Sequence, residues 1–178
     1  KILKYDPKNP TLETRDRLIL SKGHACSALY ATLANYGFFN RKELSNYGQD
    51  YSMLMAHVSH KVPGVEFSTG SLGHGLSFGS GLALAAKRKK EKWRVFVINS
   101  DGEMAEGSNW EAILFSAHHK LNNLCLIIDY NKLQSFTSVK NTLNIEPLKE
   151  KFNSFGWHTT VVDAHNHNKL NSVFNNKP

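Results

Sequence analysis

Cysteine is scarce in this sequence, with Cys26 and Cys125 the only two among 178 residues. Both fall within apolar patterns, which is typical of reduced core residues and not of a disulfide framework or a cysteine metal site. Such cysteine usage favours a cytoplasmic protein. Long hydrophobic runs are also lacking, since none approaches the ~20 apolar residues that cross a bilayer. We therefore expect no membrane-spanning segment and no membrane partner.

Acidic residues are fewer than basic ones: 15 Asp and Glu stand against 22 Lys and Arg, a net charge of +7. A basic balance is compatible with nucleic acid or with small anionic substrates. The densest basic run, residues 87–90, ends a predicted helix, where cations complement the macrodipole. No aromatic residues interleave this run, as a nucleic-acid platform would require. We therefore expect a solvated helix end there, and no nucleic-acid partner.

The length and composition predict one globular domain, since 178 residues suffice for a sizeable core. Apolar and β-branched runs predict strands at residues 17–20, 94–98, 124–130 and 157–162. Helical apolar spacing and capping residues predict helices at residues 24–36, 41–47, 108–121 and 147–155, a long helix that begins within the glycine-rich stretch 70–81, and a last short helix capped by Asn166 or Asn168.

The stretch from residue 94 to residue 133 organises the predicted fold. Two buried strands joined by a helix form a right-handed βαβ unit with parallel strands. Asp101 follows the first of these strands and Asn131 follows the second. Both side chains are therefore expected at the carboxyl edge of one sheet, which is where open α/β sheets bind ligands.

Asp101 and Asn131 offer hard oxygen donors, which suit magnesium. The backbone carbonyl of Leu133 could supply a third protein ligand, and Gly102 lets the backbone turn tightly beside the metal. A capping Asp and a turn Asn in an ordinary α/β protein would give the same spacing. The spacing alone leaves both interpretations open.

Glycines cluster before and within the start of the long helix, at Gly70, Gly73, Gly75, Gly79 and Gly81. A glycine-rich turn that leads into a helix N-terminus is a general device for binding phosphate. No Gly-Lys-Ser/Thr follows, so the stretch is not a P-loop. The spacing of the glycines also favours a smooth helix face for close packing, and both interpretations can hold together.

Two histidines are candidates for contact with a ligand. His24 lies at a helix start near the carboxyl end of the first predicted strand, where it can donate to a phosphate or serve only as a surface residue. His57 lies in an irregular stretch before the glycine-rich turn, and it suits proton handling or hydrogen bonding to substrate hydroxyls. His60 is interpreted as a surface residue.

The segments SDGEMAEGSNWEA and KLNNLCLIIDYNKLQ resemble the thiamine-diphosphate signature of transketolases, in which Gly-Asp-Gly is followed by a helix, a strand and an Asn. Ser-Lys-Gly-His-Ala and Thr-Gly-Ser-Leu-Gly-His-Gly are similar to two further motifs of that family. The sequence departs from the family pattern at two positions. Ser100 replaces the first Gly of Gly-Asp-Gly, and Ala56 stands where a Gly precedes the family's His.

The resemblance implies a thiamine-diphosphate-binding α/β fold over residues 1–178, with a mostly parallel sheet flanked by helices. It implies thiamine diphosphate as cofactor, held through Mg²⁺, with Ca²⁺ or Mn²⁺ as substitutes. The implied metal ligands are Asp101, Asn131 and the carbonyl of Leu133. The implied contacts to the diphosphate and nearby atoms are His24, Gly70, Ser71, Leu72, Gly102, Glu103 and Asn131.

The reaction that the resemblance implies is transfer of a two-carbon ketol unit from a ketose phosphate to an aldose. His57 would bind or deprotonate substrate hydroxyls. Glu106 would join a carboxylate network at a dimer interface that links two active sites, and Glu111 would extend it. Acidic residues at a helix start are also favoured by the macrodipole alone, so these two positions have an ordinary structural explanation as well.

Two family segments are expected to be absent, namely the extreme N-terminal helix and the pyrimidine-binding domain. We therefore expect a C-terminal transketolase-like subunit as partner in a dimer or heterotetramer, or else an excerpt of a longer chain. The alternatives are another thiamine-diphosphate enzyme of the deoxyxylulose-phosphate synthase type or of specialised sugar biosynthesis, a non-catalytic paralogue that binds a partner, and a magnesium-dependent phosphate-ester enzyme.

Overall fold

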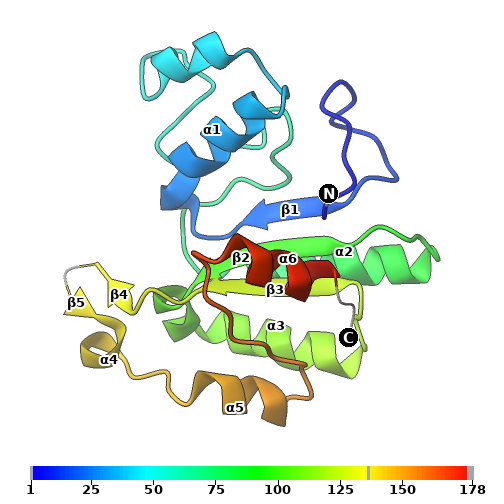
Figure 1. Ribbon diagram of the computed structural model, residues 1–178, viewed down its shortest axis with the longest axis vertical. Coiled ribbons are helices and arrows are strands. Elements are labelled where there is room, and N and C mark those ends of the chain that lie inside the picture. The colour runs from blue at the N-terminus through cyan, green and yellow to red at the C-terminus, as the bar shows by residue number, and fades with distance from the viewer. Residues whose placement is uncertain (1, 136, 176–178) are drawn as a thin grey trace.

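The computed structural model describes residues 2–135 and 137–175 and has a three-stranded parallel sheet at its centre (Figure 1). Strand β2 (Val95–Ser100) pairs with β1 (Arg17–Leu20) on one side and with β3 (Leu124–Asp129) on the other. Ser100 lies opposite Asp129, so the carboxyl ends of the strands reach one edge of the sheet. The predicted α/β class with a parallel sheet is confirmed.

Successive side chains of β1 point to opposite faces of the sheet, and each face is covered by its own hydrophobic cluster. Ile19 belongs to the larger cluster, which packs against α2 (Gly75–Arg88) and α3 (Gly107–His118). Leu20 belongs to the smaller cluster, to which α1 (Cys26–Asn35) contributes. The two clusters place helices on both sides of the sheet and leave its carboxyl edge open to the loops.

The other described elements are short and connect or extend the larger ones. The polar composition of residues 134–144 predicts a loop. The described residues of this segment, which exclude residue 136, instead contribute to two short antiparallel strands, beyond the carboxyl ends of the sheet, and form one helical turn (Figure 1). The short elements are η1 (Gly23–Ala25), η2 (Arg41–Asn46), η3 (Gly102–Ala105), β4 (Leu133–Gln134), β5 (Thr137–Ser138), α4 (Val139–Thr142), α5 (Leu148–Ser154) and α6 (His167–Asn175).

Predicted capping residues mark several helix ends in the structure. The Asn40 side chain accepts a hydrogen bond from the backbone N–H of Lys42 at 3.0 Å, and Asn166 accepts one from Lys169 at 3.0 Å. Gly37 follows α1 with φ of +84°, a conformation that suits glycine. Local sequence therefore fixes where these helices begin or end.

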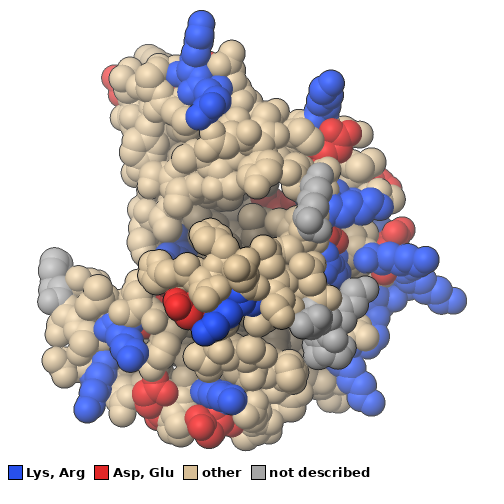
Figure 2. Space-filling model, viewed as in Figure 1, with Lys and Arg blue, Asp and Glu red and all other residues tan. Residues whose placement is uncertain are grey.

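The basic run at residues 87–90 serves a helix end, as predicted. Lys87 Nζ donates hydrogen bonds of 2.8 Å to the backbone carbonyls of His119 and Lys120, which follow α3. Figure 2 shows Lys and Arg side chains spread over the visible face, with a group at the edge where α2 ends. Within residues 2–135 and 137–175, no helix is both long and apolar enough to cross a membrane.

The strand predicted at residues 157–162 is wrong. In the described part of the chain this segment pairs with no other strand, and Val161 is 73% exposed. Trp157 instead packs its ring 5.9 Å from that of Phe152, and its Nε1–H donates to the carbonyl of Ile113 at 3.1 Å. Aromatic and β-branched residues pack well against a hydrophobic surface, and helices can provide such a surface as well as a sheet.

Helix α2 lies unusually close to β2 because glycine faces the strand. A Cβ built on Gly79 would lie 2.6 Å from Val97 Cγ2, whereas a Cβ on Gly81 would meet nothing within 4 Å. We expect Gly79→Ala to lower the free energy of unfolding by about 1–3 kcal/mol through overpacking. We expect Gly81→Ala, in the same helix, to raise it by about 0.5–1 kcal/mol because alanine favours helix.

Urea unfolding monitored by circular dichroism tests this pair of variants. Equal effects of the two substitutions would contradict the close approach of α2 to β2.

Candidate functional site

The candidate metal ligands lie in two neighbouring loops at the carboxyl edge of the sheet, which a hydrogen bond from Lys132 N to Asp101 joins. Asp101 directly follows β2 and is 0% exposed. Its Oδ1 accepts a hydrogen bond from Gly102 N at 2.8 Å, and its Oδ2 accepts one from Lys132 N at 2.6 Å. Since Lys132 lies between Asn131 and Leu133, the Asp101 carboxylate fixes the loop that carries the other two candidate ligands.

The loop after β3 makes a tight turn at Lys132. The exposed Asn131 side chain accepts from Leu133 N at 2.8 Å, which closes a tight turn around Lys132. Lys132 has φ of +65°, a conformation that is uncommon outside glycine and that clusters at functional positions. The same turn leads into Gln134, which packs over Gly102: a Cβ on Gly102 would lie 3.0 Å from Gln134 Cγ.

The chemistry of these donors fits a hard cation. A carboxylate, an amide oxygen and a carbonyl oxygen suit Mg²⁺, which takes its remaining ligands from phosphate and water. Gln134 Oε1 is buried beside this turn and has no hydrogen-bond partner among the described residues. Those residues also contain no cluster of three or more His, Cys, Asp or Glu that could hold a metal. A cation here would therefore depend on the single Asp101 carboxylate together with amide, carbonyl and ligand oxygens.

Glu103 is fully buried and ties three segments together. Its carboxylate accepts hydrogen bonds from the Ser21 hydroxyl, from Gly73 N at 2.7 Å and from Ser100 N at 3.3 Å. These partners lie after β1, in the glycine-rich turn and at the end of β2. The resemblance places Glu103 among the contacts to a diphosphate, whereas in this structure both of its oxygens are engaged by the protein.

Ser100, the first departure from the family pattern, fits its position. It is the last residue of β2, is buried, and is not among the described residues with positive φ. Its hydroxyl accepts a hydrogen bond from Glu103 N at 3.2 Å. The position therefore does not require the backbone freedom of glycine, and the protein itself accommodates the serine side chain.

The glycine-rich turn presents its first residues to solvent. Gly70 and Ser71 are exposed and Leu72 is half-buried, so their backbone is accessible to a ligand. Gly73 has φ of +85°, and a Cβ there would lie 2.6 Å from the Cβ of Glu106. The turn thus rests on the stem of Glu106, whose side chain, like that of Glu111 on α3, is exposed.

His24 and an ion pair between buried Lys22 and exposed Asp129 mark the end of β1. His24 is exposed in η1, at the start of the helix that leads away from the sheet. Lys22 Nζ lies 2.6 Å from Asp129 Oδ2, which bridges the ends of β1 and β3 across β2. Sequence reasoning missed this pair, although the polar Asp129 that ends an apolar strand was a local signal for it.

His57 is exposed in an irregular stretch, as predicted, and its backbone carbonyl accepts a hydrogen bond from the Tyr30 hydroxyl at 2.9 Å. Burial, and secondarily Cys26, raises the pKa of Tyr30 to about 12. Ala56, the second departure from the family pattern, is exposed, and its carbonyl accepts from Cys26 Sγ at 3.1 Å. Neither Ala56 nor His57 is among the described residues with positive φ.

Tyr130, next to Asn131, is held by a hydrogen bond to Glu146. Its hydroxyl donates to the Glu146 carboxylate. This hydrogen bond raises the pKa of Tyr130 to about 12 and lowers the pKa of Glu146. The contact fixes the residue that precedes the candidate ligand.

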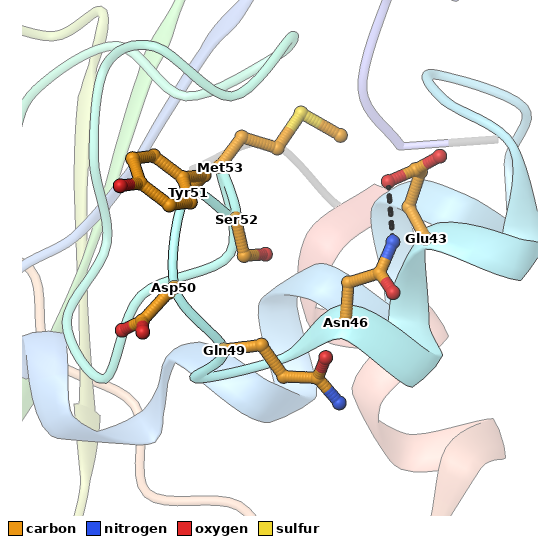
Figure 3. A pocket seen from close by; sticks show the side chains of 7 residues that line it. All are labelled: Glu43, Asn46, Gln49, Asp50, Tyr51, Ser52 and Met53. Atoms are coloured by element: carbon orange, nitrogen blue, oxygen red, sulfur yellow. Dashed lines mark hydrogen bonds between the residues drawn. The ribbon is translucent and has the colours of Figure 1, made fainter.

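A separate surface hollow of about 410 Å³ lies around η2 (Figure 3). Its lining residues are Glu43, Asn46, Gln49, Asp50, Tyr51, Ser52 and Met53, and none of them is a candidate site residue. The Asn46 side chain donates to the Glu43 carboxylate at 3.1 Å, drawn as a dashed line in Figure 3. The candidate site is therefore the carboxyl edge of the sheet and not this hollow.

Comparison with protein families matches residues 1–176 to the transketolase, thiamine diphosphate binding domain. Among curated relatives, an apulose-4-phosphate transketolase subunit of Phocaeicola vulgatus is 41% identical over 88% of this chain and 56% of its own length. A 6-deoxy-6-sulfo-D-fructose transketolase subunit of a Clostridium species is 39% identical over 97% of this chain and 63% of its own length. The chain thus spans little more than half of these relatives.

Solved structures of transketolases have the same fold. The Campylobacter jejuni enzyme superimposes with a TM-score of 0.93 at 31% identity, covering 97% of this chain and 28% of that one. A Pichia stipitis transketolase in complex with sedoheptulose-7-phosphate gives a TM-score of 0.92 at 30% identity, with the same coverage. The predicted fold and family resemblance are confirmed.

The buried Glu103 carboxylate provides a stability prediction. Glu103→Gln places an amide N–H₂ group among donors that need an acceptor, so we expect the free energy of unfolding to fall by about 1–3 kcal/mol. The matched control is Glu91→Gln, an exposed glutamate after α2, for which we expect little change. Urea unfolding of both variants measures the difference, and a Glu103→Gln protein as stable as the control would refute this role of Glu103.

Proposed function

The chain belongs to the transketolase family, and on this premise we propose that it is the diphosphate-binding part of a thiamine-diphosphate- and Mg²⁺-dependent transferase. The reaction would move a two-carbon ketol unit from a ketose phosphate to an aldose acceptor. One observation carries the proposal: the Asp101 carboxylate holds the loop of Asn131 and Leu133 against the end of β2. That arrangement collects oxygen donors and a phosphate-accessible turn at a single edge.

The residues at this edge divide the work of binding. Asp101, Asn131 and the carbonyl of Leu133 would hold the metal ion. The backbone of residues 70–72 would line the diphosphate, with His24 donating to it from a helix start. Gly102, with Gln134 packed over it, would let the backbone turn tightly beside the cofactor. Glu103 would orient the turn by accepting the hydrogen bond from Gly73 N.

When bound, thiamine diphosphate supplies the electron sink for breaking the carbon–carbon bond next to the ketose carbonyl. The chain supplies orientation and proton handling. His57 is exposed, and its imidazole would accept a hydrogen bond or a proton from a substrate hydroxyl. Glu106 and Glu111 would contribute to a carboxylate network at an interface between two copies.

A second subunit would complete the site. The apulose-4-phosphate and sulfofructose relatives are both named as transketolase subunits, and the chain covers only part of each. We propose a partner that supplies the pyrimidine-binding domain, in a dimer or heterotetramer, and the cytoplasm as location, where free Cys26 and Cys125 would stay reduced. The departures at Ser100 and Ala56, which would favour a non-catalytic paralogue, are both accommodated without strain.

Native mass spectrometry of the full-length protein from its own cells, with Mg²⁺ present, tests the proposal. We expect a complex with a second subunit that carries the mass of thiamine diphosphate. The complex should transfer glycolaldehyde units between sugars, and the purified chain alone should not. A solitary protein that binds no thiamine diphosphate, or turnover by the chain alone, would contradict the split-enzyme proposal.

The metal-binding role of the loop gives a prediction of its own. Asn131→Ala removes one proposed ligand, so we expect the affinity of the assembled protein for thiamine diphosphate in Mg²⁺ to fall by about 10- to 100-fold. Asn122→Ala, at another exposed asparagine in a loop, should leave the affinity within about twofold of wild type. Isothermal titration calorimetry measures both, and equal affinities would remove Asn131 from the ligand set.

A further inference from the structure

Helix α1 anchors three successive backbone carbonyls of the irregular stretch that carries His57. Cys26 Sγ lies 3.6 Å from the carbonyl oxygen of Met55 and 3.1 Å from that of Ala56. The Tyr30 hydroxyl donates to the carbonyl of His57 at 2.9 Å. A segment without regular secondary structure is thereby held by side chains from a neighbouring helix.

The two side chains that make these contacts are buried. Cys26 is 0% and Tyr30 is 1% exposed, and both belong to the smaller hydrophobic cluster. Leu54 and Val58, which flank the three anchored residues, are buried in the same cluster. The backbone of this stretch is held by buried side chains, whereas His57 is exposed to solvent, from which a substrate would arrive.

The other candidate histidine, His24, lies just before the same helix. Residue His24 lies in η1, which runs directly into α1, and Tyr30 follows later on α1. Because a helix is rigid over this distance, α1 fixes the position of the His57 backbone relative to the end of β1. Tyr30 is suited to this task because a carbonyl oxygen can only accept, and a phenol hydroxyl can donate to it.

We infer that Tyr30 is a positioning residue for His57, setting through one hydrogen bond the direction from which the imidazole meets a substrate hydroxyl. The inference rests on the proposed function of His57. A group that handles protons must be held close to its productive geometry, and a shift of about 1 Å can lower the rate by about 100-fold. Supporting contacts of this kind hold a reactive side chain in its productive position even when it lies on an irregular loop.

Tyr30→Phe tests the inference, since it removes the hydroxyl and keeps the ring. In the complex with the partner subunit we expect kcat/KM for the ketose donor to fall by about 10- to 100-fold. The affinity for thiamine diphosphate should stay within about twofold, because Tyr30 acts through His57 and not through the cofactor loop. Tyr47→Phe is the control: its ring lies 6.2 Å from that of Tyr30, and its hydroxyl contacts Cys26 but none of the three anchored carbonyls.

A double-mutant cycle separates positioning from a general structural effect. In a His57→Ala background, Tyr30→Phe should cause no further loss of kcat/KM, because the group that it positions is gone. Equal loss in the two backgrounds would overturn the inference.

A readout without turnover distinguishes failure of this inference from failure of the proposed function. In protein labelled with ¹³C at histidine Cε1, the His57 resonance is assigned by its loss in His57→Ala. We expect that resonance to shift or broaden in Tyr30→Phe and to stay unchanged in Tyr47→Phe. An unchanged resonance in Tyr30→Phe overturns the inference, whereas a shifted resonance in a protein with no transferase activity supports the anchor and contradicts the proposed function.

Discussion

The buried carboxylate of Glu103 is the interaction on which the carboxyl edge depends. Removing a charge from water costs several kcal/mol unless hydrogen bonds replace the lost hydration. Here the donors are the Ser21 hydroxyl and the backbone N–H groups of Gly73 and Ser100. Because these donors come from three separate segments, satisfying one charge requires all three segments to be in place. The edge is therefore ordered by the protein itself, before any ligand contributes.

Asp101, which is also fully buried, has a similar role at the end of β2. Its two oxygens accept from Gly102 N and Lys132 N, which joins the ends of β2 and β3. The buried acids thus hold backbone, whereas Asn131 and His24, which we propose as ligand contacts, are exposed. A site organised in this way would need little reorganisation on binding, because hydrogen bonds within the protein already fix its buried acids, among them the proposed metal ligand Asp101.

Sequence reasoning predicted the βαβ unit because continuous apolar runs and helical spacing are local signals, and the parallel arrangement then brings Asp101 and Asn131 together. It failed at residues 157–162, because β propensity does not distinguish strand pairing from packing such as that of Trp157. It also could not foresee the bond from Tyr30 to His57, since nothing local marks a phenol that reaches a carbonyl 27 residues away. The motif suggested Glu103 as a site residue but carried no information on its burial.

The two departures from the family pattern show how a substitution can be tested by its surroundings. A Ser in place of Gly at residue 100 would disrupt the edge if its position required positive φ or close approach of a ligand. Instead Ser100 ends a paired strand, and its hydroxyl accepts from the N–H of Glu103, so the side chain adds a hydrogen bond to those that surround the buried carboxylate. Ala56 keeps its carbonyl in the anchored series held by Cys26. Both substitutions are therefore compatible with the backbone conformation that presents the candidate groups.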